Sequence, residues 1–128
     1  MTPQDPSAAA PPIDPASLLA LRAMNPGDDS FLREIIQIFL DDSPARISEI
    51  EQGLASADTR LLTRAAHSLK GSSSNFGAAR LQAVCEKIEK LGRTGSLAEV
   101  PPLLAQVKTE FAAVRSALEA VQNADPGK

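Results

Sequence analysis

One residue stands out as able to do chemistry, and it is His67, the only histidine of the chain. A neutral imidazole has a lone pair on one ring nitrogen near neutral pH, so it can attack a phosphoryl group. Lys70 and Gly71 follow one helical turn later, and Arg64 precedes by three residues, so a helix would place all of them beside the imidazole. A nearby cation stabilises the charge of a transferred phosphoryl group. The spacing therefore favours His67 as a phosphoryl acceptor with Lys70 as its charge partner.

The predicted helix around His67 has an apolar stripe that faces away from the histidine. At about 100° per residue, His67 points to solvent or to the rim of a bundle, on the same side as Ser74. A glycine inside a helix costs about 1 kcal/mol relative to alanine, so we expect Gly71 to leave clearance for another protein's active site. The alternatives are tolerance or close helix packing for Gly71, and solvated surface for Lys70 and Arg64. The stripe consists of Leu62, Ala65, Ala66, Leu69 and Ser73.

Composition argues against several other classes of protein. The net charge of −3 gives no reason to expect nucleic-acid binding. The single cysteine, Cys85, cannot form an internal disulfide, which favours a reducing cytoplasm, and no apolar run approaches the length of a membrane span. We find no Glu-x-x-His pair for a di-iron site and no glycine-rich phosphate loop, so we expect no metal and no autonomous kinase activity.

Apolar residues recur every three or four positions through the middle of the chain, which predicts helices and no sheet. We expect one domain over residues 13–122, between a disordered arm (1–12) and a disordered tail (123–128). Short connections make long helices antiparallel. The prediction is an all-α, up-down-up-down four-helix bundle with a short extra N-terminal helix. The expected helices span approximately residues 15–24, 28–57, 58–75, 78–93 and, starting between 96 and 102, to 122.

Prolines modify two of these helices. Pro44 lies within the second and is expected to kink or restart it, because proline lacks the N–H that a helix interior needs. Ser96 and Glu99 have the spacing of a capping box for the fifth helix. Pro101 and Pro102 argue instead for a break there.

The second helix is apolar over a wider arc than one packed face requires, roughly 200° by helical geometry. One explanation is that the first helix covers the excess through Leu18, Leu19 and Leu21. The other is a docking patch for a partner protein, which Met24 would join because methionine adapts to several partners. The proposed patch consists of Met24, Phe31, Ile35 and Ile38.

The segment that begins at His67, HSLKGSSSNFGA, resembles the histidine phosphotransfer family of phosphorelays, whose pattern is H-x-L-K-G-S-S followed by G-A. The resemblance continues through Leu81 and residues 84–89, and Phe31–Asp42 matches the family's F-x₇-F-x₂-D helix. It implies a four-helix bundle in which His67 takes phosphoryl from one receiver-domain aspartate and gives it to another. Lys70 would stabilise charge and Gly71 would provide clearance.

The same resemblance implies the partners, which are response-regulator receiver domains and a hybrid sensor histidine kinase. The Mg²⁺ and the acidic pocket that promote transfer would belong to the receiver, so the chain itself would be a cytoplasmic, monomeric carrier without a cofactor. Glu89 falls where some members carry glutamine beside the imidazole, and a carboxylate there would repel phosphate unless Lys70 pairs with it. The alternatives are a phosphoacceptor domain of a chemotaxis-type or hybrid kinase, and a helical adaptor without chemistry.

Overall fold

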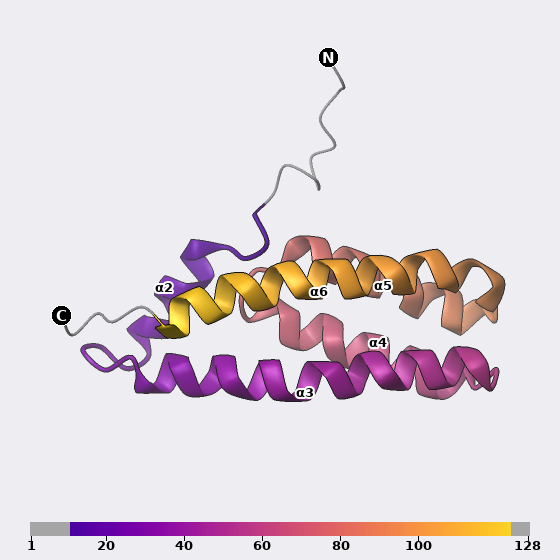
Figure 1. Cartoon of the computed structure of the whole chain (residues 1–128), viewed down its shortest axis with the longest axis horizontal. Helices are drawn as coiled ribbons and strands as arrows, with labels where there is room; N and C mark the ends of the chain where they lie inside the picture. Colours follow the sequence, from indigo (N-terminus) through magenta and orange to yellow (C-terminus); the bar gives the residue numbers. More distant parts are fainter. Residues whose placement is uncertain (1–10, 124–128) are drawn as a thin grey trace, which may run out of the picture.

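Four long helices run side by side along the longest axis of the molecule (Figure 1). The computed structural model describes residues 11–123, which contain α-helices, one 3₁₀ turn and no strand. The predicted all-α class is therefore confirmed. The predicted arm and tail lie outside the described residues, apart from residues 11, 12 and 123. Asn123, which was expected to begin the tail, is instead the last residue of a helix. The elements are α2 (Pro15–Ala23), α3 (Ser30–Ala55), α4 (Thr59–Ser74), α5 (Ala79–Thr94), η1 (Leu97–Glu99) and α6 (Val100–Asn123).

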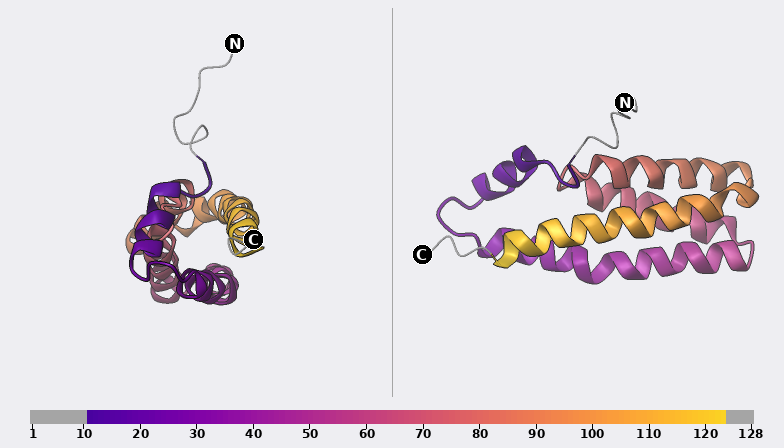
Figure 2. Two further views of the ribbon diagram at one scale, coloured as in Figure 1. Left: turned by 90° about the vertical axis from the view of Figure 1, so that its left-hand side faces the viewer. Right: turned by 45° about the horizontal axis from the view of Figure 1, so that its top comes forward.

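The four long helices close into a bundle around a single core. Each packs on the next in the chain, and α6 returns to pack on α3, as the view along the bundle shows (Figure 2). Consecutive helices are antiparallel because the connections between them are short. None of the helices in the described residues is both long and apolar enough to cross a membrane. The fully buried aliphatic side chains include Leu32, Ile36, Ile50, Leu62, Leu69, Leu81, Ile88, Val107 and Leu118.

The prolines interrupt the helices less than the sequence suggested. Helix α3 continues through Pro44, so the predicted restart is wrong. The Pro44 side chain is exposed, while Phe39 and Ile47 on either side of it are buried in the core. Their burial outweighs the cost of a proline inside a helix, about 3 kcal/mol. At the other site, Pro101 and Pro102 lie in the first turn of α6, where no intrahelical N–H is needed.

The connection into α6 is a 3₁₀ turn rather than a capped helix start. Ser96 makes no side-chain cap hydrogen bond, so the predicted capping box with Glu99 does not form. The preceding helix, α5, ends at Thr94 and is capped by Gly95, whose φ of 76° is left-handed, and the N–H of Ser96 bonds to the carbonyl of Leu91 at 2.9 Å.

Helix α2 is attached to one end of the bundle. The Asp14 carboxylate caps it by accepting the N–H of Ala16 at 2.9 Å, and the Asp14 N–H bonds to the Phe76 carbonyl at 2.9 Å. Leu18 and Leu21 are buried, as expected. Leu19 is 63% exposed, so the expectation that it covers α3 is wrong.

Candidate functional site

Helix α4 begins at a defined cap and presents His67 at its surface. The Asp58 carboxylate accepts the N–H of Leu61 at 3.1 Å, which satisfies one of the free donors of the first turn. Leu62, Ala66 and Leu69 have no exposed surface and hold the predicted stripe in the core. The His67 side chain is 65% exposed, so it is open to a partner protein.

Helix α5 approaches α4 closely beside His67 because Gly92 faces α4. A Cβ atom on Gly92 would lie 2.9 Å from Leu62 Cδ2 and would contact the Thr63 hydroxyl. The absence of a side chain at Gly92 therefore permits the approach. Glu89 lies one turn before Gly92 on α5, and this approach brings its carboxylate to the imidazole.

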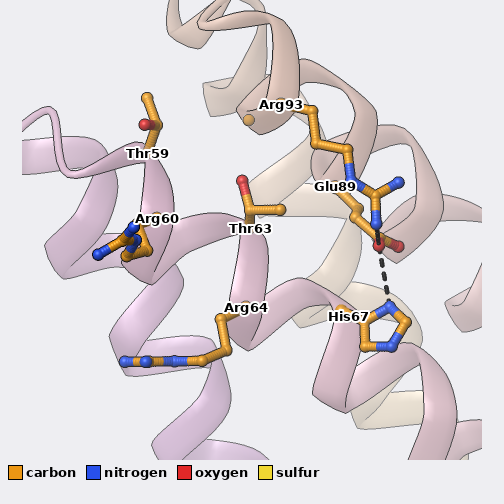
Figure 3. A pocket seen from close by; sticks show the side chains of 8 residues that line it. Thr59, Arg60, Thr63, Arg64, His67, Glu89 and Arg93 are labelled. Atoms are coloured by element: carbon orange, nitrogen blue, oxygen red, sulfur yellow. Dashed lines mark hydrogen bonds and ion pairs between the residues drawn. The ribbon is translucent and has the colours of Figure 1, made fainter.

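Glu89 is the centre of the site's polar network. Its side chain is only 1% exposed, and both of its carboxylate oxygens accept hydrogen bonds from neighbouring side chains. Oε2 lies 2.9 Å from His67 Nδ1 and also accepts from Nη2 of Arg93 (Figure 3). Oε1 accepts from Lys70 Nζ at 2.7 Å. The pairing with Lys70 on which the predicted role of Glu89 depended is therefore present.

The network keeps Glu89 ionised. Burial by itself would raise the pKa of the Glu89 carboxyl, but hydrogen bonds from Lys70 and His67 and the charges of Lys70 and Arg93 outweigh it, so the pKa lies below its usual value. A carboxylate is only an acceptor, so Nδ1 of His67 must be the nitrogen that carries hydrogen. In the neutral imidazole, the lone pair is then on Nε2, which faces away from Glu89 (Figure 3).

The side of His67 toward the end of α4 is open. Gly71 is exposed, and a Cβ built on it would meet nothing within 4 Å. Close helix packing therefore does not explain this glycine. Ser74, two turns from His67, uses its hydroxyl to bond to the Gly71 carbonyl at 2.6 Å, so it closes the last turn of α4 and does not join the imidazole.

A shallow groove of about 440 Å³ extends from His67 in the other direction, toward the start of α4. Arg64 lies here, exposed and without an ion pair to any described residue. The groove is open, and most of the residues that line it are polar or charged, which suits contact with a protein surface. Its lining consists of Thr59, Arg60, Thr63, Arg64, His67, Glu89, Gly92 and Arg93.

The proposed docking residues differ in exposure. Met24 is 69% and Ile38 is 61% exposed, whereas Phe31 and Ile35 are half-buried. Apolar surface at Ile38 remains uncovered by α2, so docking by a partner stays a prediction that the exposure favours. Ile38 belongs to a second groove, between α3 and the end of α4, lined by Ile35, Ile38, Phe39, Asp42, Ser72, Asn75 and Phe76.

Sequence reasoning missed Arg93, which the structure places on Glu89. The signal was present, because a glutamate four residues before an arginine on one helix is a standard ion-pair spacing. Cys85 is buried as predicted, and burial raises the pKa of its thiol to about 12. The described residues contain no cluster of three or more His, Cys, Asp or Glu that could hold a metal ion.

Comparisons with known proteins agree with this geometry. The family model of the Hpt domain matches residues 34–124. Histidine-containing phosphotransfer protein 4 of Arabidopsis thaliana is 30% identical over 92 residues, which cover 70% of this chain and 72% of that protein. Multistep phosphorelay regulator 1 of Schizosaccharomyces pombe is 28% identical over 81 residues, or 62% of this chain and 28% of that protein.

A solved structure with a similar fold is histidine-containing phosphotransfer protein B of Pseudomonas aeruginosa PAO1. Its TM-score is 0.81 at 32% identity, and the superposition covers 89% of this chain and 96% of that one. Sequence and fold therefore point to the same family.

Proposed function

Because the chain belongs to the Hpt domain family, we propose that it is a phosphorelay phosphocarrier that holds its phosphoryl group on Nε2 of His67. The observation that carries the proposal is the pairing of His67 Nδ1 with the buried carboxylate of Glu89. It fixes the tautomer in which Nε2 has the lone pair, and His67 is exposed enough for a partner to reach that nitrogen.

The chemistry is the reversible transfer of a phosphoryl group between an aspartate oxygen and the imidazole nitrogen. The Nε2 lone pair attacks the phosphorus of a receiver's aspartyl phosphate, a P–N bond forms, and the P–O bond to the aspartate breaks to release its carboxylate. The imidazole gains a positive charge while Nδ1 keeps its hydrogen. In the reverse step, the carboxylate of a second receiver attacks the phosphorus, and the P–N electron pair returns to Nε2.

The charges around Glu89 suit this exchange. The Glu89 carboxylate lies next to the ring that becomes positive, so it stabilises the phosphorylated imidazole. Lys70 has three N–H donors, and only one is needed for Glu89. The others are available to phosphoryl oxygens, which offsets the repulsion that the carboxylate alone would exert on phosphate.

The remaining parts of the reaction are assigned to the partners. We propose that receiver domains of response regulators and of a hybrid sensor histidine kinase supply the aspartates and the Mg²⁺, and that this chain has no ATP site or cofactor of its own. We further propose that it acts as a cytoplasmic monomer. The buried thiol of its single cysteine is consistent with a reducing compartment.

The test is phosphotransfer with a His67→Gln variant. Wild-type and variant chains are incubated with each phosphorylated receiver domain of the source genome, and acid-labile phosphate on the chain is followed. We expect the wild type to accept label from a small subset of receivers and the variant to accept none while keeping the same helicity. Label retained by the variant would refute the assignment of His67.

A further inference from the structure

The charges of α4 differ from those of the rest of the molecule. The chain has a net charge of −3, yet Thr59–Ser74 contains three basic residues and no acidic one. Among the basic residues that the structure describes, Arg60, Arg64 and Lys87 alone make no ion pair or hydrogen bond with another described residue. Two of these three lie on α4, in the groove that leads to His67.

The two arginines are near His67 but do not serve its phosphoryl group directly. Arg60 is seven residues, about 10 Å along the helix axis, from His67. In Figure 3 the Arg64 side chain extends away from the imidazole, and Nε2 faces away from the third arginine of the groove, Arg93. The distance of Arg60 from His67 exceeds the screening length of about 8 Å at physiological salt, so its charge acts little on the phosphoryl group and mainly on a surface that lies against the arginine itself.

We propose that Arg60 and Arg64 form a basic docking surface that receives an acidic face of the receiver domain. This inference rests on the proposed function. A receiver domain that exchanges phosphoryl on its aspartate with the help of Mg²⁺ needs carboxylates around that aspartate to bind the ion. During transfer these carboxylates must come next to His67. The exposed, unpaired guanidinium groups complement that negative charge and accelerate encounter.

The basic surface and the apolar patch lie on opposite sides of His67 along α4. Arg60 and Arg64 precede the histidine, whereas the groove at Ile38 is lined by Ser72 and Asn75, which follow it. A partner in contact with both surfaces therefore spans the imidazole. Contact at two sides fixes the partner's orientation as well as its position, which in-line transfer requires.

The experiment compares two double charge reversals of equal size. Arg60→Glu with Arg64→Glu removes the basic surface. Lys87→Glu with Lys90→Glu is the control, because these exposed lysines line a separate groove of α5 with Leu103 and do not line the groove at His67. The readout is kcat/KM for transfer from the receiver domain that reacts fastest in the phosphotransfer profile.

We expect the arginine reversal to lower kcat/KM about tenfold at low salt, with the difference vanishing near 1 M salt, where the screening length is about 3 Å. The lysine control should stay within about twofold of wild type, since it changes net charge but not the docking surface. Equal effects of the two reversals, or an effect that salt does not remove, would overturn the proposal.

Two further measurements separate docking from phosphorylation. Titration calorimetry of the unphosphorylated chain with the same receiver should show weaker binding for the arginine reversal alone, whether or not His67 accepts phosphoryl. Phosphoramidate is a small phosphoryl donor that needs no docking, so it should label the wild type, the arginine reversal and the lysine control equally. Failure to label the wild type would contradict the assignment of His67 and would leave the docking surface untouched.

Inorganic phosphate distinguishes a protein partner from a small anion. At constant ionic strength, replacing chloride by phosphate should leave the wild-type transfer rate unchanged if the arginines meet an extended acidic face. Selective inhibition by phosphate in the wild type, absent from the arginine reversal, would mean that the groove binds a small anion, and the docking proposal would be wrong.

Discussion

The two nitrogens of His67 face very different surroundings. Nδ1 lies against a buried carboxylate whose two oxygens have donors from His67, Lys70 and Arg93. Nε2 faces away from Glu89 (Figure 3), and toward the end of α4 Gly71 contributes no side chain, so that a Cβ there would meet nothing within 4 Å. The chain therefore determines the tautomer of its imidazole on one side, and leaves the other side for groups that a partner supplies.

This contrast separates two kinds of substitution. Changes on the Nδ1 side should alter the chemistry of the phosphorylated chain in the absence of any partner. Changes on the Nε2 side should alter only the reaction with a partner. Measuring stability, phosphohistidine lifetime and transfer rate on the same variants tests whether the division holds.

The largest effect is expected from Gly71→Gln, on the open side. The longer side chain would occupy the space through which a receiver's aspartate must approach, and we expect the transfer rate to fall about 100-fold. Gly71→Ala is the matched control, and it should raise the free energy of unfolding by up to about 1 kcal/mol because nothing lies near its Cβ. Transfer rates and thermal unfolding are measured on both. A normal rate for Gly71→Gln would remove the clearance argument.

The next effect concerns the apolar patch. Ile38→Glu places a charge on a side chain that is 61% exposed, so we expect receiver binding to weaken about 30-fold, or roughly 2 kcal/mol, with little change in helicity. Gln37→Glu adds the same charge to the adjacent residue, which contacts Gln122 of α6 instead. Binding is measured by titration. Equal losses for the two variants would show that charge alone, and not the patch, matters.

A smaller effect is expected on the Nδ1 side from Lys70→Ala. The substitution removes the ammonium that pairs with Glu89 at 2.7 Å, so phosphoryl charge next to the carboxylate is no longer offset. We expect about tenfold slower transfer and a shorter phosphohistidine lifetime with the fold intact. Lys90→Ala, at an exposed lysine on another face, is the control. Unchanged lifetime and rate would show that Lys70 only pairs with Glu89 and takes no part in phosphotransfer.

The smallest effect, about 1 kcal/mol, is expected in the pH dependence of stability. The pKa of Glu89 is lower in the folded chain than its ordinary value of 4.5, so folding favours the ionised form. The resulting stabilisation is present above pH 4.5 and is lost as the pH falls through the lower, folded value. Glu89→Gln should therefore lower the free energy of unfolding mainly above pH 4.5. Urea unfolding of wild type and variant at pH 7 and at pH 3 measures this, and the loss should be larger at pH 7. An equal loss at both pH values would contradict this linkage.

Sequence alone predicted the four long helices to within a few residues, because their apolar positions recur at helical spacing, and α4 begins directly after Asp58, which caps it. It did not predict that α3 passes through Pro44. Whether a proline breaks a helix depends on how much burial the adjacent turns gain, and that gain comes from helices distant in sequence.

The exposure of Leu19 has a similar explanation. The direction in which α2 leaves the bundle depends on the hydrogen bond between Asp14 and the Phe76 carbonyl, a contact between residues far apart in the chain. Periodicity reveals which face of a helix is apolar but not which neighbour covers it. For this reason the sequence revealed the excess apolar arc of α3 and its possible coverage by α2, but it did not reveal that Leu19 would stay outside that contact.

For the site, the spacing around His67 was enough to identify the exposed histidine and its neighbours on α4. The contribution of α5 was harder to predict, because it depends on the close approach at Gly92. Glu89 was noticed only through the family resemblance, and Arg93 was overlooked although its spacing from Glu89 is visible in the sequence. Interactions between helices carry the part of the site that local patterns do not contain.

The hydrogen bond from His67 Nδ1 to Glu89 also bears on how the phosphorylated chain can be imitated. Phosphohistidine exists as two isomers, with phosphorus on either ring nitrogen, and an Nδ1 substituent here would meet a buried carboxylate. A stable analogue should therefore carry its phosphonate at the position equivalent to Nε2, and antibodies raised against that isomer should detect the chain. Antibodies raised against the Nδ1 isomer should not bind the phosphorylated chain.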